Sequence, residues 1–399
     1  MRPSCPPPPR PSWRAALPAV LFVAAMFFFN YTGRAILGPL LVPMERALGL
    51  DHVQSTSLLL VLSTGFCAGV FFSGFAAAKI RPHRLVGGSA IAAGCMLLLL
   101  ARADSAGAAR LFILLMGLSC GFYLTAAMAT LGSLVRAEDW SRTVAVHELS
   151  PAVSFIVSPL FAETAAKHLG WQGAILIMGY VSLGSGILFL LFGKGGREKT
   201  DMPSVSGVVS AFKRPVLWAF IWIFTLGIAG EFAPFSVLSL SLTVEQGLDS
   251  AAAARLLSLS RLATPFAVLA GGWAAMRFGP GRSLLLFLLA HGLALMAMAL
   301  PFSLTGTTFQ ALAMMCQSAA SGFVFPALFT VLARAFPQKQ QPMVLSFCLP
   351  LAAYLAMGIG PVLLGACGEY LRFSYGYLIF GLLCLGTIPV LRYCEPEDR

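Results

Sequence analysis

Uninterrupted apolar runs recur along the whole chain and limit its fold more than any other feature. Ile91–Leu100 and Ala290–Leu300 contain no acidic residue, lysine or arginine. A helix that crosses a bilayer needs about 20 such residues, whereas a membrane barrel is built of shorter segments with alternating polarity. Only 11% of the residues are charged, against about 25% in soluble domains. The sequence therefore predicts an all-α membrane protein rather than a soluble or disordered one.

Twelve membrane spans are predicted from these runs. They are 15–44, 53–78, 84–102, 107–135, 141–168, 170–193, 214–244, 250–276, 281–300, 306–335, 340–369 and 371–393.

The basic residues fall mainly on one side of this arrangement. Of the 27 lysines and arginines, 19 lie on the side of the N-terminus and six on the other, while Arg34 and Arg261 fall inside spans. This is the positive-inside pattern. It predicts a multi-pass protein of the plasma membrane, in bacteria the inner membrane, with both termini cytoplasmic. The net charge of +11 then reflects topology and contact with anionic lipid, and nucleic-acid binding is not expected.

Motifs for a metal, a cofactor or catalysis are missing from the sequence. The nine cysteines form no Cys-x-x-Cys pair and no cluster with histidine, and no nucleotide-binding loop occurs. We therefore expect no cofactor, no metal site and no enzyme activity.

The two halves of the chain repeat one another at a fixed offset of 198 residues. When the sequence is aligned with itself after a shift of 198 residues, Gly49-Leu50-Asp51 matches Gly247-Leu248-Asp249, Gly74 matches Gly272, and Arg136 matches Arg334. The offset holds from the first loop to the fifth of each half. We predict a tail at 1–14, a six-helix bundle at 15–193, a cytoplasmic linker at 194–213, a second bundle at 214–393 and a tail at 394–399.

The repeat carries a loop motif in both copies. Gly74 is followed by Lys79 and Arg84, and Gly272 by Arg277 and Arg282. Two six-helix halves with this motif after their second helix resemble the Major Facilitator Superfamily. In that family an acidic residue follows the glycine, whereas this chain has Ala78 and Met276. The interdomain charge relay built on that acid is therefore not expected here.

The resemblance implies a secondary transporter, usually a monomer, with a small-molecule site near mid-membrane between the two bundles. The bundles rock about that site, so that it opens to each side of the membrane in turn. The six loop residues, Gly74, Lys79, Arg84, Gly272, Arg277 and Arg282, would then act as cytoplasmic gating loops.

Charges inside membrane spans are costly and therefore mark candidate sites. Arg34 lies near mid-depth of the first span, and Asn30, Tyr31 and Gly38 share its helical face. A guanidinium there can hold a carboxylate through two hydrogen bonds. The alternative is an arginine paired permanently with an acid of the protein.

Glu231 and Arg261 are the corresponding charges of the second half. Glu231 lies at almost the same depth as Arg34, near Gly227, Gly230 and Pro234. It can couple transport to protons, or it can form a static latch with an arginine. Arg261, in Ser258-Leu259-Ser260-Arg261, resembles the mid-helix arginine of organic-anion carriers in this superfamily. Either substrate contact or a structural ion pair would suit it.

Further polar residues complete the candidate site. Glu148 lies nearer the inner end of its span, where a proton exit or an ion pair with Arg136 or Arg142 is expected. Tyr123, Gln317 and Tyr354 lie on spans that can line the path, or form hydrogen bonds between helices.

The leading hypothesis is proton-coupled movement of a small organic anion, most simply a carboxylate. Arg34 and Arg261 would hold the anion, with Asn30, Tyr31, Tyr123, Gln317 and Tyr354 around it, and Glu231 and Glu148 would carry protons. The alternatives are a proton-driven exporter of lipophilic compounds, which two intramembrane arginines disfavour, and a receptor or scaffold without flux.

Overall fold

The computed structural model describes residues 12–136, 139–197, 213, 215–335 and 348–393. These ranges are almost entirely helical and contain no strand. Most of the predicted tails at 1–14 and 394–399, most of the predicted linker at 194–213, and the first part of the predicted span at 340–369 lie outside the described residues.

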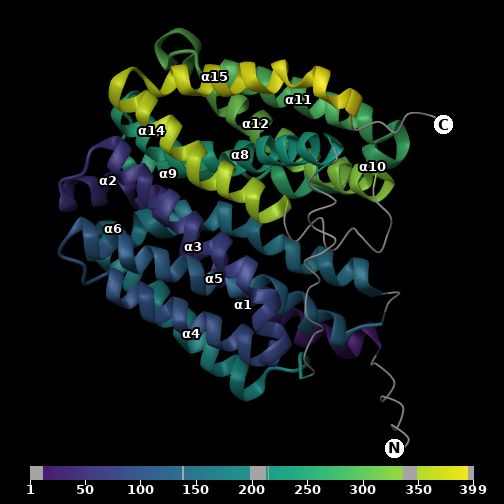
Figure 1. Ribbon diagram of the computed structural model, residues 1–399. Coiled ribbons are helices and arrows are strands. Elements are labelled where there is room, and N and C mark those ends of the chain that lie inside the picture. The colour runs from purple at the N-terminus through teal and green to yellow at the C-terminus, as the bar shows by residue number, and fades with distance from the viewer. Residues whose placement is uncertain (1–11, 137–138, 198–212, 214, 336–347, 394–399) are drawn as a thin grey trace, which may run out of the picture.

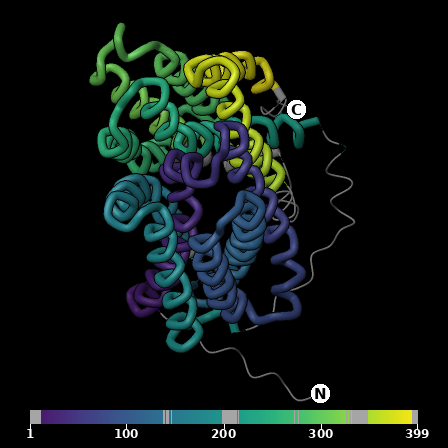
Figure 2. The backbone as a smooth tube through the Cα atoms, turned by 90° about the vertical axis from the view of Figure 1, so that its left-hand side faces the viewer, coloured from purple at the N-terminus to yellow at the C-terminus, as the bar shows by residue number. Residues whose placement is uncertain are grey.

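The first half of the chain forms one bundle, drawn in purple and blue in Figures 1 and 2. Its helices are α1 (Trp13–Ala35), α2 (Leu37–Leu48), α3 (His52–Lys79), α4 (Pro82–Leu100), α5 (Ala106–Leu134) and α6 (Trp140–Phe192). The long element α6 turns back at Gly170, whose φ of 72° and ψ of 169° are not helical. Because α1 and α2 together make one crossing and α6 makes two, this bundle crosses six times.

The second half forms the other bundle, drawn in green and yellow. Its helices are α8 (Pro215–Val244), α9 (Ser250–Ser260), α10 (Thr264–Phe278), α11 (Pro280–Met298), α12 (Phe302–Ala335), the π-helix η2 (Tyr354–Ile359), α14 (Gly360–Tyr370), α15 (Phe373–Gly386) and the 3₁₀-helix η3 (Ile388–Tyr393).

Helix length and apolarity confirm the predicted fold class. Ten candidate membrane spans are found among the described residues, and one of them, Val146–Phe192, contains the two crossings of α6. The helix α12 supplies the remaining crossing, after a break at Gly306. The all-α architecture of twelve membrane helices in two bundles is thus as expected.

The predicted spans at 15–44 and 250–276 are found as Trp13–Leu48 and Ser250–Ala275, and each contains a break in its helix. The first breaks at Ile36, between α1 and α2, and the second at residues 261–263, between α9 and α10. Pro39 and Pro265 explain the breaks. Each lacks the N–H that would bond the carbonyl four residues earlier, which is that of Ala35 or of Arg261.

The two bundles meet mainly at the end of the molecule opposite the chain termini, which we call the far end. It carries the turns after α2, α4, α8, α11 and α14 and the turn within α6. There α2 packs on α8, α3 packs on η2 and α14, and α6 packs on α9. A Cβ atom added at Gly38 of α2 would lie only 2.8 Å from the Cα of Ser236 in α8. The closed far end thus depends on a backbone approach that only glycine allows.

Gly38→Ala should open the far end, because its methyl group would overlap the backbone of α8. Spin labels at the exposed positions Arg102 and Leu304, in a background without the native cysteines, would gain a longer distance component. Gly107→Ala is the matched control, since a Cβ at Gly107 meets nothing within 4 Å. A Gly38→Ala distance distribution identical to that of the parent would contradict this role of Gly38.

Candidate functional site

Arg34 is a buried cation, held at the break between α1 and α2. It lies in the last turn of α1, where the helix dipole favours a positive charge. Only 2% of the residue is exposed, and its Nε has no hydrogen-bond partner among the described residues. The guanidinium carbon lies 4.7 Å from the centre of the Tyr31 ring and 4.3 Å from that of Phe66. Its neighbours are therefore aromatic faces rather than acids.

Arg261 repeats this arrangement in the second bundle. It is the C-cap of α9 and is 1% exposed. Within the ranges that the structure describes, neither its Nε nor its Nη1 has a hydrogen-bond partner. The guanidinium carbon lies 5.1 Å from the ring centre of Phe235 and 5.3 Å from that of Phe155. In the part of the chain that the structure describes, no carboxylate oxygen comes within 4.0 Å of either arginine.

Four aromatic side chains, Tyr31, Phe66, Phe155 and Phe235, connect the two arginines, and we call them the aromatic wall. The Phe155 ring, on α6 of the first bundle, is 5.2 Å from Tyr31 and 4.4 Å from Phe235 of the second bundle. Phe155 is 1% exposed and belongs to the apolar core of the second bundle. The site therefore lies where the two bundles meet.

Glu231 brings a negative charge to the same region. It lies on α8 and is partly exposed, and its carboxylate interacts electrostatically with Arg261 and Glu148. The Tyr31 hydroxyl interacts electrostatically with all four of these charged side chains, Glu231, Arg34, Arg261 and Glu148. Because no ion pair within 4.0 Å joins Glu231 to Arg261 in the described ranges, the two charges are close but separate.

Glu148 adjoins a buried histidine of the first bundle. Its side chain is 50% exposed, and its Oε1 lies 3.0 Å from Nδ1 of His147. The His147 ring is fully buried and stacks on Phe27 at 4.2 Å. Its Nε2 is 3.3 Å from the Tyr123 hydroxyl, which also donates to the Val23 carbonyl at 2.7 Å. The polar atoms of Tyr123 and His147 are thus used within the bundle.

Asn30, Gln317 and Tyr354, the other predicted site residues, differ in their surroundings. Asn30 is 5% exposed, and both polar atoms of its side-chain amide lack a hydrogen-bond partner in the described ranges. The Gln317 amide donates to the carbonyl of Gly230. Tyr354 is partly exposed and begins the π-helix η2, an element that is frequent at functional sites.

The six residues of the repeated loop motif lie away from the arginines, at the end that carries the chain termini. Gly74 and Lys79 belong to α3 and Arg84 to α4, while Gly272 and Arg277 belong to α10 and Arg282 to α11. The four basic side chains are exposed.

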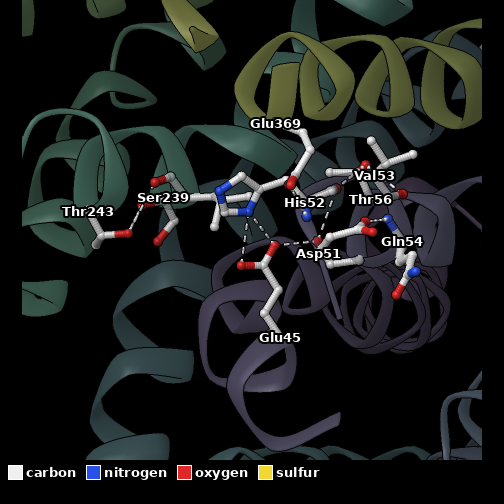
Figure 3. Close-up of polar contacts among 11 residues, drawn as sticks. Glu45, Asp51, His52, Val53, Gln54, Thr56, Ser239, Thr243 and Glu369 are labelled. Atoms are coloured by element: carbon white, nitrogen blue, oxygen red, sulfur yellow. Dashed lines mark hydrogen bonds and ion pairs between the residues drawn. The ribbon is translucent and has the colours of Figure 1, made fainter. Parts of the chain in front are cut away.

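Polar contacts link the bundles at the far end, as Figure 3 shows around His52. The His52 backbone N–H, at the start of α3, donates to Oε2 of Glu369 on α14 at 2.9 Å. The His52 Nδ1 lies 3.0 Å from Oε1 of Glu45 on α2. The contact between His52 and Glu45 lies within the first bundle. A second contact between the bundles joins the Ser250 hydroxyl, at the start of α9, to Oε1 of Glu163 on α6, at 3.0 Å. The two contacts between the bundles, from His52 to Glu369 and from Ser250 to Glu163, hold the far end closed.

The sequence singled out Tyr31 but not the other three residues of the aromatic wall. Phe66, Phe155 and Phe235 are three of 31 phenylalanines, and nothing in their spacing separates them from ordinary core residues. The buried arginines indicated only that some side chain must contact them, since a charge inside a membrane needs a stabilising partner.

The profile of the Major Facilitator Superfamily matches residues 23–347 and 229–399. The chain belongs to the Major Facilitator Superfamily. It is therefore a multi-pass membrane transporter of small molecules. A search of curated protein sequences found no match.

Solved structures of other superfamily members share this fold. A bacterial homologue of the human lysosomal transporter Spinster, inward-facing and unoccupied, has a TM-score of 0.76 at 14% identity, over 98% of this chain and 100% of that one. The nucleoside transporter NupG reaches 0.79 at 14% identity, over 95% and 100%. A D-xylose–proton symporter reaches 0.71 at 11% identity, over 94% and 97%. At these identities the likeness concerns the fold alone.

Arg34→Met and Arg261→Met should each raise the melting temperature of the ligand-free protein. A buried cation without an acid costs stability, by about 1 kcal/mol or more once its ring contacts are counted, whereas methionine also packs well on aromatic rings. Arg372→Met is the control. Arg372 is 65% exposed, and its contact with Glu245, at 3.8 Å, is long for an ion pair. This substitution should therefore change the free energy of unfolding by no more than about 0.5 kcal/mol. A lower melting temperature for both site variants would instead indicate structural ion pairs.

Proposed function

We propose that this transporter moves a small organic anion, most simply a carboxylate, together with protons. Arg34 and Arg261 bind the anion from opposite bundles, Glu231 binds the proton, and Glu148 lies on the route by which the proton leaves. One observation carries this proposal: two buried guanidinium groups, one in each bundle, have N–H groups that find no hydrogen-bond partner in the described part of the chain.

A carboxylate suits the geometry of these arginines. The aromatic wall contacts both guanidinium groups, and a ring that stacks on the guanidinium face leaves the N–H edge for hydrogen bonding. That edge bonds planar oxyanions through two parallel N–H···O contacts. An anion held from both sides would also draw the bundles together, as alternating access requires.

Electrostatics favour symport over exchange. With Glu231 ionised, the two arginines and this acid carry a net charge of +1, and protonation raises it to +2. The proton therefore strengthens anion binding, and by linkage the anion strengthens proton binding to the same extent. Substrate and proton are then bound together and released together.

Two other functions are weaker candidates. A lipophilic cation would have to enter a site with two arginines and a single nearby carboxylate, against the local charge. A receptor or scaffold without flux would have no need for unpartnered cations between the bundles, since these reduce stability.

We also propose how the molecule is oriented. With both termini in the cytoplasm of a bacterial cell, as the basic loops favour, the far end faces outward and its polar contacts form the outer gate. The repeated loops with Lys79 and Arg277 then lie at the inner surface, where they gate the cytoplasmic side. A monomer suffices for this mechanism.

Arg34→Gln and Arg261→Gln should each lower anion uptake into proteoliposomes about 100-fold or more, because each removes two charge-assisted hydrogen bonds worth about 1.5–3 kcal/mol apiece. Uptake of radiolabelled monocarboxylates and dicarboxylates, driven by an inward proton gradient, is the measurement. Arg372→Gln is the exposed control. A variant that keeps the wild-type rate would remove its arginine from the binding site.

Glu231→Gln should separate binding from proton coupling. A glutamine has the neutral charge of a protonated glutamate at every pH, so this variant should bind the anion at high pH as tightly as the wild type does at low pH. Accumulation driven by a proton gradient should be lost. Calorimetric titration at two pH values checks the first effect and proteoliposome uptake the second. If affinity keeps its wild-type pH dependence, Glu231 is not the coupling residue.

A further inference from the structure

Two neighbouring residues of α12, Gln317 and Ser318, each bond a different helix of the second bundle. The Gln317 side-chain amide donates to the carbonyl of Gly230 on α8. The Ser318 hydroxyl donates to the carbonyl of Ser260, the last residue of α9. Gln317 is 2% exposed and Ser318 fully buried, so both bonds are shielded from water and are costly to break.

The two accepting carbonyls immediately precede the two functional charges. Gly230 is followed by Glu231, and Ser260 by Arg261. Local structure makes both carbonyls available. The Gly230 carbonyl has no helical donor, because Pro234, four residues on in α8, has no N–H. Gly230 also allows close packing there, since a Cβ would overlap the His291 ring of α11. Ser260 ends α9, where carbonyls lack a partner within the helix, and the nearby Thr264 N–H bonds Arg261 instead.

Hydrogen bonds from α10 and α11 hold this part of α12 in place. Gln317 also accepts through its backbone carbonyl, with His291 Nδ1 at 3.2 Å. The Thr264 hydroxyl at the start of α10 donates to the carbonyl of Ser318 at 3.4 Å. Gln317 and Ser318 are therefore held in place by α11 and α10 as well. They can act as a rigid spacer between α8 and the break after α9.

We propose that Gln317 and Ser318 are positioning residues, which hold Glu231 and Arg261 near one another but too far apart to form an ion pair. This inference rests on the proposed function and gives it a structural basis. Without the spacer, Glu231 and Arg261 would close into a static pair, and the anion would have to break that pair before it could bind Arg261. The role differs from substrate contact, the alternative raised by the sequence for Gln317.

The test compares four single variants and one double variant in detergent. Gln317→Met keeps the side-chain length but has no donor, and Ser318→Ala removes only the hydroxyl. Ser321→Ala is the matched control, because its buried hydroxyl bonds only the Ser318 carbonyl of its own helix. Carboxylate affinity is measured by calorimetry with a panel of monocarboxylates and dicarboxylates, together with melting temperature.

Gln317→Met and Ser318→Ala should each weaken carboxylate binding by about tenfold, with melting temperatures close to that of the control. Ser318→Thr, which keeps the hydroxyl, should restore the affinity. In the double variant Gln317→Met with Glu231→Gln, the loss should disappear, because a neutral side chain cannot capture Arg261. Unchanged affinity in the single variants, or a loss that persists in the double variant, would overturn the positioning role.

A second measurement needs no substrate and separates this inference from the proposed function. Infrared titration follows the carboxyl band of Glu231, assigned by its loss in Glu231→Gln. Gln317→Met should move the titration midpoint by about 0.5 pH unit or more, since the distance to Arg261 changes. If the wild type binds no carboxylate but the midpoint moves, the proposed function fails and the positioning role stands. If carboxylates bind through Arg34 but the midpoint is unchanged, the positioning role fails alone.

Discussion

The cost of a buried cation without an acid underlies the whole arrangement of this transporter. Arg34 and Arg261 are almost completely buried and carry N–H groups without partners. Stacking on an aromatic face contributes about 0.5–2 kcal/mol, and position at a helix C-terminus adds about 0.3–1 kcal/mol. Together these contributions offset part of the cost of desolvating the two arginines. A bound ligand would offset the remainder. Under the proposed function, this remaining cost would make the site favour a group that brings negative charge and planar acceptors.

Helix breaks connect this electrostatic constraint to the fold. Both arginines lie where a span is interrupted, one just before Ile36 and the other at the end of α9. Each break places a helix end, with its free backbone groups, at the depth of the site. The same region contains Phe155, which joins the cores of the two bundles. Under the proposed function, substrate binding and bundle movement would involve the same residues.

Hydropathy and internal repetition were sufficient to predict the helices and the family, because the lipid solvent requires continuous apolar spans and a duplicated chain keeps its offset. The charged residues inside the membrane spans could also be identified from the sequence, because each interrupts an apolar run. The two helix breaks were not predicted, although Pro39 and Pro265 each remove a backbone N–H from the helix. The bond from His52 to Glu369 joins residues 317 positions apart, and no local pattern can predict such a pair. Which of 31 phenylalanines would stack on arginine likewise depends on tertiary packing.

The most direct test of the account is a ligand panel on the purified protein. Melting temperatures would be measured with organic anions, lipophilic cations and neutral solutes at two pH values, since a ligand at a hundred times its dissociation constant stabilises by about 2.7 kcal/mol. The account predicts stabilisation by carboxylates, larger at the lower pH, and none by carboxylates when Arg34 or Arg261 is glutamine. Stabilisation by lipophilic cations alone would contradict it and make the protein an exporter of such compounds.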